Sequence, residues 1–230
     1  MTDDRSFEII QDTELPGTPE RVWEAVTAGT SAWMFPTEQW PAVKTVEEHP
    51  TRLVSRMDGP DGWFNQLEHV LAPLAGGRAS LHYVHSGIFA DNWDEQYDGA
   101  SRHTEFYLHT LGQYLQHFDG RAVVFTDIQG PAESITPDGF ERLRSALGVD
   151  AAGPGGRVDV ELDGVGRLSA EVDFANKHFL GLRTSDALYR FFGRNAWGAP
   201  VGMTVHDFSG SADTGATAAV WGKFLATVCA

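Results

Sequence analysis

The stretch RHTEFYLHTLGQYLQHF at residues 102–118 decides the fold, because it is the clearest helix in the chain. Its apolar and aromatic residues recur at i, i+4, i+7, i+8 and i+11, which places them on one face of an α-helix. They are Tyr107, Leu111, Tyr114, Leu115 and Phe118. Gly120, two residues beyond the last of them, is a typical C-terminal cap. The spacing therefore predicts a long amphipathic helix.

The residues before this helix predict one strand, one capped helix and an antiparallel meander. Thr18 is a good N-cap, and Pro19 suits the first helical position. A short helix and loop follow at residues 31–40, and an acidic loop at residues 91–99 leads to the long helix. The predicted strands are residues 6–14, 43–49, 51–57, 63–72 and 77–86, with turns at His49-Pro50 and at residues 73–77.

The order of elements then starts again. A strand at residues 122–128 precedes Thr136-Pro137-Asp138, which repeats the capping pattern of Thr18-Pro19-Glu20. Later elements are predicted as strands at residues 157–164, 166–174, 177–184 and 201–208, a short helix at residues 186–195 and a terminal helix at residues 213–228.

The two long helices match at an offset of 110 residues, which pairs Leu111 with Trp221 and Gly112 with Gly222. A mid-helix glycine costs about 1 kcal/mol relative to alanine, so two equivalent glycines suggest close packing or room kept for a ligand. The alternative is chance similarity between two amphipathic helices. We favour a tandem duplication, with a first domain at residues 1–120 and a second, shortened one at residues 121–230.

Charge and composition exclude several classes of protein. The 230 residues include 17 basic and 32 acidic side chains, a net charge of −15, with no cluster of cations. Nucleic acid and anionic membrane surfaces are therefore disfavoured as partners. The single cysteine, Cys229, cannot form an intrachain disulfide. With no signal-peptide pattern at the start and no apolar stretch near the ~20 residues of a membrane span, we expect a cytoplasmic protein.

The order strand, capped helix, short helix, antiparallel strands and long helix resembles that of the START-like helix-grip (SRPBCC) superfamily. The resemblance is greatest to homologues of the heat-shock-protein ATPase activator. It is carried by FEIIQDTELPGTPERVWEAVT at residues 7–27, Trp33-Met34-Phe35, GGRASLHYVHSG at residues 76–87 and TLGQYLQHF at residues 110–118. The second half resembles the same plan more weakly, and it looks like a second copy rather than a cochaperone module.

The resemblance implies an α+β fold in which a curved antiparallel sheet wraps around the long C-terminal helix. In relatives, the cavity between them takes lipids, polyketides, hormones or aromatic metabolites, and no invariant catalytic motif carries over to this chain. We expect the ligand-binding residues to be those whose elements would surround such a cavity; each could instead be core packing. They are Trp33, Phe35, Trp63, His69, His82, Tyr83, Tyr107, Leu111 and Tyr114.

We include His69 and His82 among the predicted ligand-binding residues because of the predicted hairpin. If residue 69 pairs with residue 80, the two imidazoles are diagonal neighbours on one face of the sheet. His82 and His85, three residues apart in a strand, point to opposite faces and cannot chelate one ion together.

No motif in the sequence predicts a metal or a cofactor. The acidic loop lacks the spacing of an EF-hand, the glycine-rich residues 151–157 lack a phosphate-loop pattern, and no G-x-S-x-G elbow is present. The candidate cation ligands in the acidic loop are Asp91, Asp94, Glu95 and Asp98.

Three classes of function stay open. The leading hypothesis is a protein that binds a hydrophobic small molecule in the cavity. The second is a cyclase, dehydratase or hydrolase acting there, which a Tyr–His or His–carboxylate pair pointing into the cavity would favour. The third is an interaction or stress-response protein that acts through dimerisation.

Overall fold

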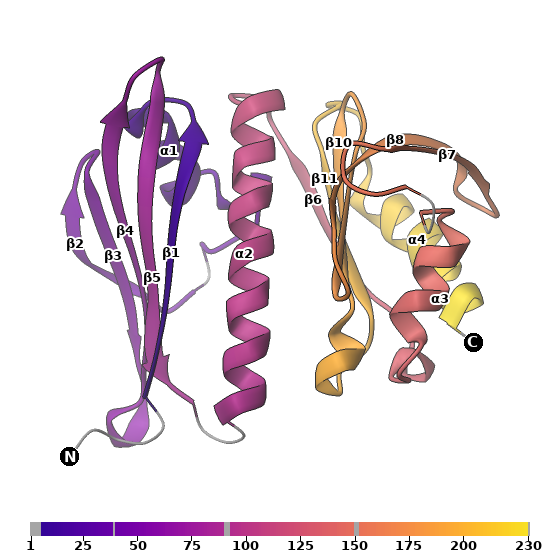
Figure 1. Cartoon of the computed structure of the whole chain (residues 1–230), viewed down its shortest axis with the longest axis horizontal. Coiled ribbons are helices and arrows are strands. Elements are labelled where there is room, and N and C mark those ends of the chain that lie inside the picture. The colour runs from indigo at the N-terminus through magenta and orange to yellow at the C-terminus, as the bar shows by residue number, and fades with distance from the viewer. Residues whose placement is uncertain (1–5, 39, 90–92, 150–151, 230) are drawn as a thin grey trace. The chain divides into compact units, whose positions relative to one another are not determined.

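The structure, a computed structural model, describes residues 6–38, 40–89, 93–149 and 152–229. The chain divides into two compact units, Met1–Asp119 and Gly120–Ala230. Each unit is built on one antiparallel sheet with helices, so the α+β prediction is confirmed (Figure 1).

The first unit has a five-stranded sheet in the order β1-β5-β4-β3-β2. Its first strand therefore pairs with its last, and the remaining strands form a meander. Short 3-10 turns at Thr30–Ala32 and Pro60–Gly62 complete the unit. Its main elements are β1 (Ser6–Pro16), α1 (Pro19–Thr27), β2 (Val43–Glu48), β3 (Arg52–Asp58), β4 (Phe64–Leu74), β5 (Arg78–Ile88) and α2 (Trp93–His117).

Helix α2 runs along one face of this sheet and contacts β1 and α1 (Figure 1). The predicted apolar face is confirmed, because Leu111 is fully buried and Phe118, just beyond the helix, is 1% exposed. This is the arrangement of the START-like helix-grip fold. Neither α2 nor any other helix in the described part of the chain is long and apolar enough to cross a membrane.

The acidic segment before residue 102 is not a loop. Helix α2 already begins at Trp93, so Asp94, Glu95 and Asp98 are helical. Acidic side chains in a first turn interact favourably with the positive end of the helix dipole, which explains how a charged segment starts a helix. Asp91 lies outside the described residues.

The second unit has a six-stranded sheet in the order β6-β11-β10-β9-β8-β7. Helices α3 and α4 pack on each other, and α4 also packs on β6. Short 3-10 turns lie at Ala132–Ser134 and Arg194–Trp197. The main elements are β6 (Val124–Gln129), α3 (Gly139–Ala146), β7 (Arg157–Leu162), β8 (Gly166–Ala175), β9 (Phe179–Arg183), β10 (Ala187–Phe192), β11 (Gly202–Asp207) and α4 (Thr214–Cys229).

The predicted short helix at residues 186–195 is wrong. Residues 187–192 form β10, a central strand between β9 and β11. Five of its six residues are buried, so no polar–apolar alternation marks it as a strand. A short apolar run of this kind cannot be assigned by periodicity alone.

The two units share one topology, since in both the first strand pairs with the last and a helix follows. A Cβ atom at Gly112 would lie 3.8 Å from Leu15 in β1, and one at Gly222 would lie 3.9 Å from Ile128 in β6. Both are ordinary contact distances, so neither glycine is needed to admit a bulky neighbour, and the interpretation as close packing is wrong. Each glycine does face the first strand of its own unit.

Other parts of the predicted repeat differ between the units. Thr18 is the N-cap of α1, whereas Asp138 takes that position before α3, so the capping pattern is not repeated. The second unit is shorter in its last helix, 16 residues against 25, but its sheet has one more strand. The shared topology supports a tandem duplication, which stays a prediction.

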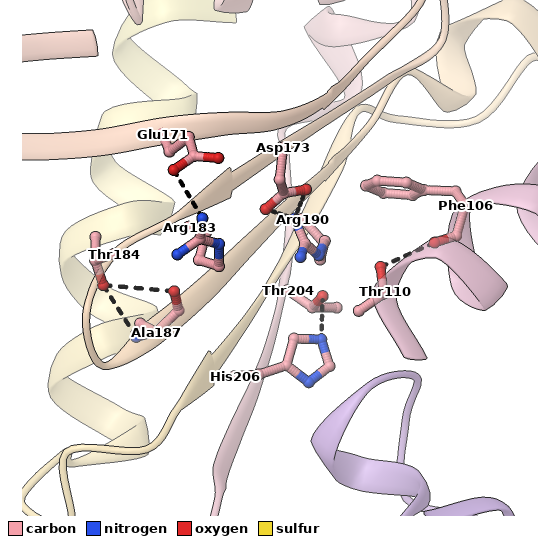
Figure 2. Close-up of polar contacts among 10 residues, drawn as sticks. All are labelled: Phe106, Thr110, Glu171, Asp173, Arg183, Thr184, Ala187, Arg190, Thr204 and His206. Carbon is pink, nitrogen blue, oxygen red and sulfur yellow. Dashed lines mark hydrogen bonds and ion pairs between the residues drawn. The ribbon is translucent and has the colours of Figure 1, made fainter. Parts of the chain in front are cut away.

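A buried ion pair explains one glycine of the second sheet. Asp173 lies at an irregularity in the β8–β9 pairing, and both its oxygens accept hydrogen bonds from Nη1 of Arg190, at 2.8 and 2.9 Å (Figure 2). Gly181 is the residue opposite Arg190 in β9. A Cβ atom there would lie 2.3 Å from both Arg190 Nη1 and Asp173 Oδ1, closer than real contacts allow.

We predict that Gly181→Ala destabilises the protein by about 1–3 kcal/mol, because the methyl group must displace the ion pair. The measurement is the midpoint of urea unfolding. Gly153→Ala is the matched control, since nothing lies within 4 Å of a Cβ atom there. Equal midpoints for the two variants would contradict this account of Gly181.

Candidate functional site

A cavity of about 270 Å³ lies in the first unit, between the inner face of the sheet and helices α1 and α2. Its walls include aromatic and aliphatic side chains such as Trp33, Trp40, Leu53 and Leu67. Ten side chains on its walls carry hydroxyl, amine, carboxyl or imidazole groups: Thr27, Thr30, Thr37, Glu38, Lys44, Ser55, His69, Tyr83, Thr104 and Tyr107.

The strand register brings the central wall residues together. His69 in β4 lies directly between Leu53 in β3 and Tyr83 in β5. Directly opposed residues of an antiparallel pair share a face, so all three side chains point to the cavity. The rings of His69 and Tyr83 are 5.1 Å apart and nearly perpendicular. The Tyr83 hydroxyl lies near Thr104 of α2.

His69 is a buried polar residue of the wall with unused bonding capacity. It is only 5% exposed, and Nδ1 has no hydrogen-bond partner among the described residues. An unsatisfied buried polar group costs about 1–3 kcal/mol. Nδ1 has almost no accessible surface, so it lies within the wall and does not face the cavity. Burial lowers the pKa of His69 to about 4, which keeps the imidazole neutral at pH 7. Burial also raises the pKa of Tyr83, so its hydroxyl keeps its proton.

Four of the nine predicted ligand-binding residues line the cavity: Trp33, His69, Tyr83 and Tyr107. The Trp33 indole donates a hydrogen bond to the Ala25 carbonyl, 2.9 Å away, which holds the ring in place. The predicted residues are therefore a minority of the side chains that line the cavity.

Four others are not among the wall residues. Phe35 packs edge-on against Tyr107 of the wall, with ring centres 6.0 Å apart. Trp63 precedes β4 and packs over Gly59. Leu111 and Tyr114 are buried farther along α2, in the core.

The ninth residue, His82, lies on the opposite face of the sheet, because the predicted register is wrong. Residue 69 pairs with residue 83, not 80. The difference is an odd number of residues, and an odd shift turns a side chain to the other face. His82 is exposed, and its Nδ1 is 2.7 Å from Oδ1 of Asp12.

Sequence reasoning missed most of the polar wall. Thr30 and Thr37 share a 3.0 Å hydrogen bond in a segment without helical or strand periodicity, so no pattern pointed to them. Thr104 could have been found, because it precedes Leu108 by one helical turn.

The described residues contain no group of three or more His, Cys, Asp or Glu side chains placed to hold a metal ion.

Several solved structures are similar to this chain. Protein MLL2253 from Mesorhizobium loti is 18% identical, with a TM-score of 0.41, over 49% of this chain and 99% of its own. The Aha1 dimer from Colwellia psychrerythraea is 12% identical, with a TM-score of 0.40, over 50% and 99%. The di-domain ARO/CYC BexL from the BE-7585A biosynthetic pathway is 12% identical, with a TM-score of 0.34, over 97% of both chains.

No protein-family model matches the chain, and no curated protein matches it in sequence. The sequence identities and TM-scores of these solved structures are low. The assignment of the helix-grip fold therefore rests on the strand order and the helix packing of the chain itself.

We predict that stability falls as the pH drops from about 7 towards 4, because two buried histidines resist protonation only in the folded state. Burial lowers the pKa of both His69 and His85 to about 4, whereas an unfolded histidine titrates near 6.5. Below about pH 6.5 the unfolded chain therefore binds more protons than the folded chain, so acid favours unfolding. The full pKa shift of each histidine corresponds to a loss of about 3 kcal/mol in the free energy of unfolding.

Urea unfolding of the full chain at about pH 7 and about pH 5 measures this slope. His69→Gln should reduce the slope, and the same substitution at His85 should also reduce it. An unchanged slope in His69→Gln would contradict the account in which the lowered pKa of His69 contributes to the pH dependence of stability.

Proposed function

We propose that the first unit binds a small, largely apolar molecule in the cavity between its sheet and helices α1 and α2. The observation that carries the proposal is the cavity itself, whose wall combines aromatic and aliphatic side chains with the buried imidazole of His69. Small-molecule sites are concave and mostly apolar, with a few placed polar groups that orient the ligand. Burial of ligand surface would supply the affinity, at about 25 cal/mol per Å² of apolar area.

A second candidate is an acid–base enzyme, such as a cyclase or dehydratase, in the same cavity. The observation in its favour is that His69 and Tyr83 both line the cavity and are neighbours in the sheet. A neutral imidazole accepts a proton, and a tyrosine that keeps its proton donates one. A hydrolase, and an interaction protein acting through a homodimer, stay predictions from the sequence.

The binding proposal predicts that filling the cavity abolishes binding. Ser55 in β3 lines the cavity, and Ser55→Phe would place a ring in it. Compounds from a thermal-shift screen of lipids and aromatic metabolites should bind the natural chain, quench its tryptophan fluorescence, and fail with Ser55→Phe.

Ser80→Phe is the matched control, because Ser80 points to the other face of the sheet from Tyr83. It should bind like the natural chain. Retained binding in a folded Ser55→Phe protein would show that the ligand lies elsewhere.

The enzyme candidate predicts conversion of a compound found in that screen. Mass spectrometry after incubation with the natural chain should reveal a product, and Tyr83→Phe should slow its formation by about 100-fold or more. The dissociation constant should change far less. A bound compound recovered unaltered from the natural chain would count against catalysis.

A further inference from the structure

The wall of the cavity has a buried part that carries no charge. Trp33, Leu53 and Leu108 belong to it and are between 2% and 6% exposed. Its titratable groups, His69 and Tyr83, stay neutral at pH 7 because burial opposes their ionisation. A charged group placed there would lose its hydration without gaining a partner. The buried part of the wall therefore suits the apolar body of a ligand.

The exposed part of the wall comes from three residues that lie close together in the sequence. Glu38, Trp40 and Lys44 all line the cavity and are exposed, and we call these three residues the mouth. The indole of Trp40 is 37% exposed despite its large apolar ring. Glu38 and Lys44 are also the charged residues among the described wall residues. A ligand with a charged group would therefore place that group at the mouth.

Contacts with neighbouring residues hold part of the mouth in position. The side chains of Thr30 and Thr37 share a 3.0 Å hydrogen bond, and Glu38 directly follows Thr37. The backbone N–H of Trp40 donates a 3.0 Å hydrogen bond to the Thr37 carbonyl. Its ring also packs edge-on against Phe35, with ring centres 5.5 Å apart. A side chain that is already held in place loses little conformational entropy when a ligand binds.

The uncompensated charge at the mouth is negative. Nζ of Lys44 is 2.7 Å from Oε1 of Glu47, so this cation already has a partner. The carboxylate of Glu38 has no hydrogen bond or ion pair with another side chain in the part of the chain that the structure describes. An anion that bound to Lys44 would have to compete with Glu47, whereas a cation that bound to Glu38 would displace no side chain.

Two further features favour a cation at the mouth. An ammonium group over the face of an aromatic ring is attracted by the ring quadrupole, and tryptophan attracts it most strongly. Trp40 offers such a ring two residues from Glu38. In addition, residues 1–120 carry 7 basic and 19 acidic side chains. An excess of one charge attracts ligands of the opposite charge and raises their association rate.

We propose that the ligand is an amphipathic amine, whose apolar body lies in the buried part of the cavity and whose protonated amino group lies at the mouth. The carboxylate of Glu38 and the ring of Trp40 bind the amino group. This inference rests on the proposed binding function and adds the charge of the ligand to it. It assigns Glu38 as the residue that selects a cation.

Titration of the full chain with three probes of one skeleton tests the inference: 4-phenylbutylamine, 4-phenylbutan-1-ol and 4-phenylbutanoate. By calorimetry at about pH 7 and low salt, the amine should bind about fivefold more tightly than the alcohol, the upper end of the range for one exposed ion pair. The carboxylate should bind most weakly. At about 1 M salt the Debye length falls to about 3 Å, so the preference for the amine should shrink.

Substitutions at the mouth assign the preference to residues. Glu38→Gln removes the charge and keeps the shape of the side chain, so the amine should lose most of its advantage over the alcohol. Glu38→Lys should reverse the order and make the carboxylate the tightest ligand. Trp40→Leu keeps an apolar side chain without a ring, so it should weaken the amine about threefold relative to the alcohol.

Glu48→Gln is the matched control. Glu48 is an exposed carboxylate at the end of β2 that is not among the wall residues, and its substitution changes the net charge by the same amount as Glu38→Gln. This variant should keep the preference for the amine. Both glutamates are exposed, so neither substitution should prevent folding.

The outcomes separate the two proposals. If none of the probes binds the natural chain, the proposed function fails together with the inference. If all three bind equally, or the carboxylate binds most tightly, the cavity binds small molecules but the inference is overturned on charge. If Glu48→Gln reduces the preference as much as Glu38→Gln, the net charge of the chain selects the amine and the role of Glu38 is overturned.

Discussion

The pairing of β1 with β5 is the constraint on which the first unit depends. It runs along all of β1, from Ser6 opposite Ile88 to Pro16 opposite Arg78. The start of the chain thereby lies beside the strand that leads to α2, and α1 is brought back over the inner face, where it contacts β4 and β5. The cavity is the space that this closure leaves between the sheet and the two helices. Its position follows from the topology, and its chemistry follows from the register.

The strand register places the imidazole of His69 on the cavity wall and so affects the chemistry of that wall. A core optimised only for stability would place an apolar side chain at a buried central position, because a partnerless buried nitrogen is costly. The chain instead keeps an imidazole between Leu53 and Tyr83. Places where a sequence departs from local consistency are expected at functional sites, and this one lies on the wall of a cavity. The same burial that makes His69 costly also lowers its pKa and keeps the imidazole neutral.

The predictions from the sequence were correct for features that depend on local periodicity. They failed where pairing between residues far apart in the sequence determines the structure. The face of α2 followed from the spacing of Leu111 and Tyr114, and most strands followed from alternation and turns. The register at His69 was wrong because the predicted hairpin turn began too early: β4 continues through Pro73 to Leu74. Strand β10 was missed because burial on both faces removes the alternation that identifies a strand. Thr37 and Ser55 reach the wall through tertiary placement, which no local pattern records.

The second unit repeats the topology with a larger side chain at one core position of its last helix. Trp221 of α4 matches Leu111 at the offset of 110 residues, and its indole packs against Tyr189, Phe191 and Phe224 at ring distances of 5.4 to 5.9 Å. A bulky indole at this position puts aromatic volume between the helix and the sheet, where it contributes to the core of the unit. Leu111, the matching residue of α2, is also fully buried, so this position contributes to the core in both units. The cavity of the first unit lies elsewhere on the helix, beside Thr104, Tyr107 and Leu108.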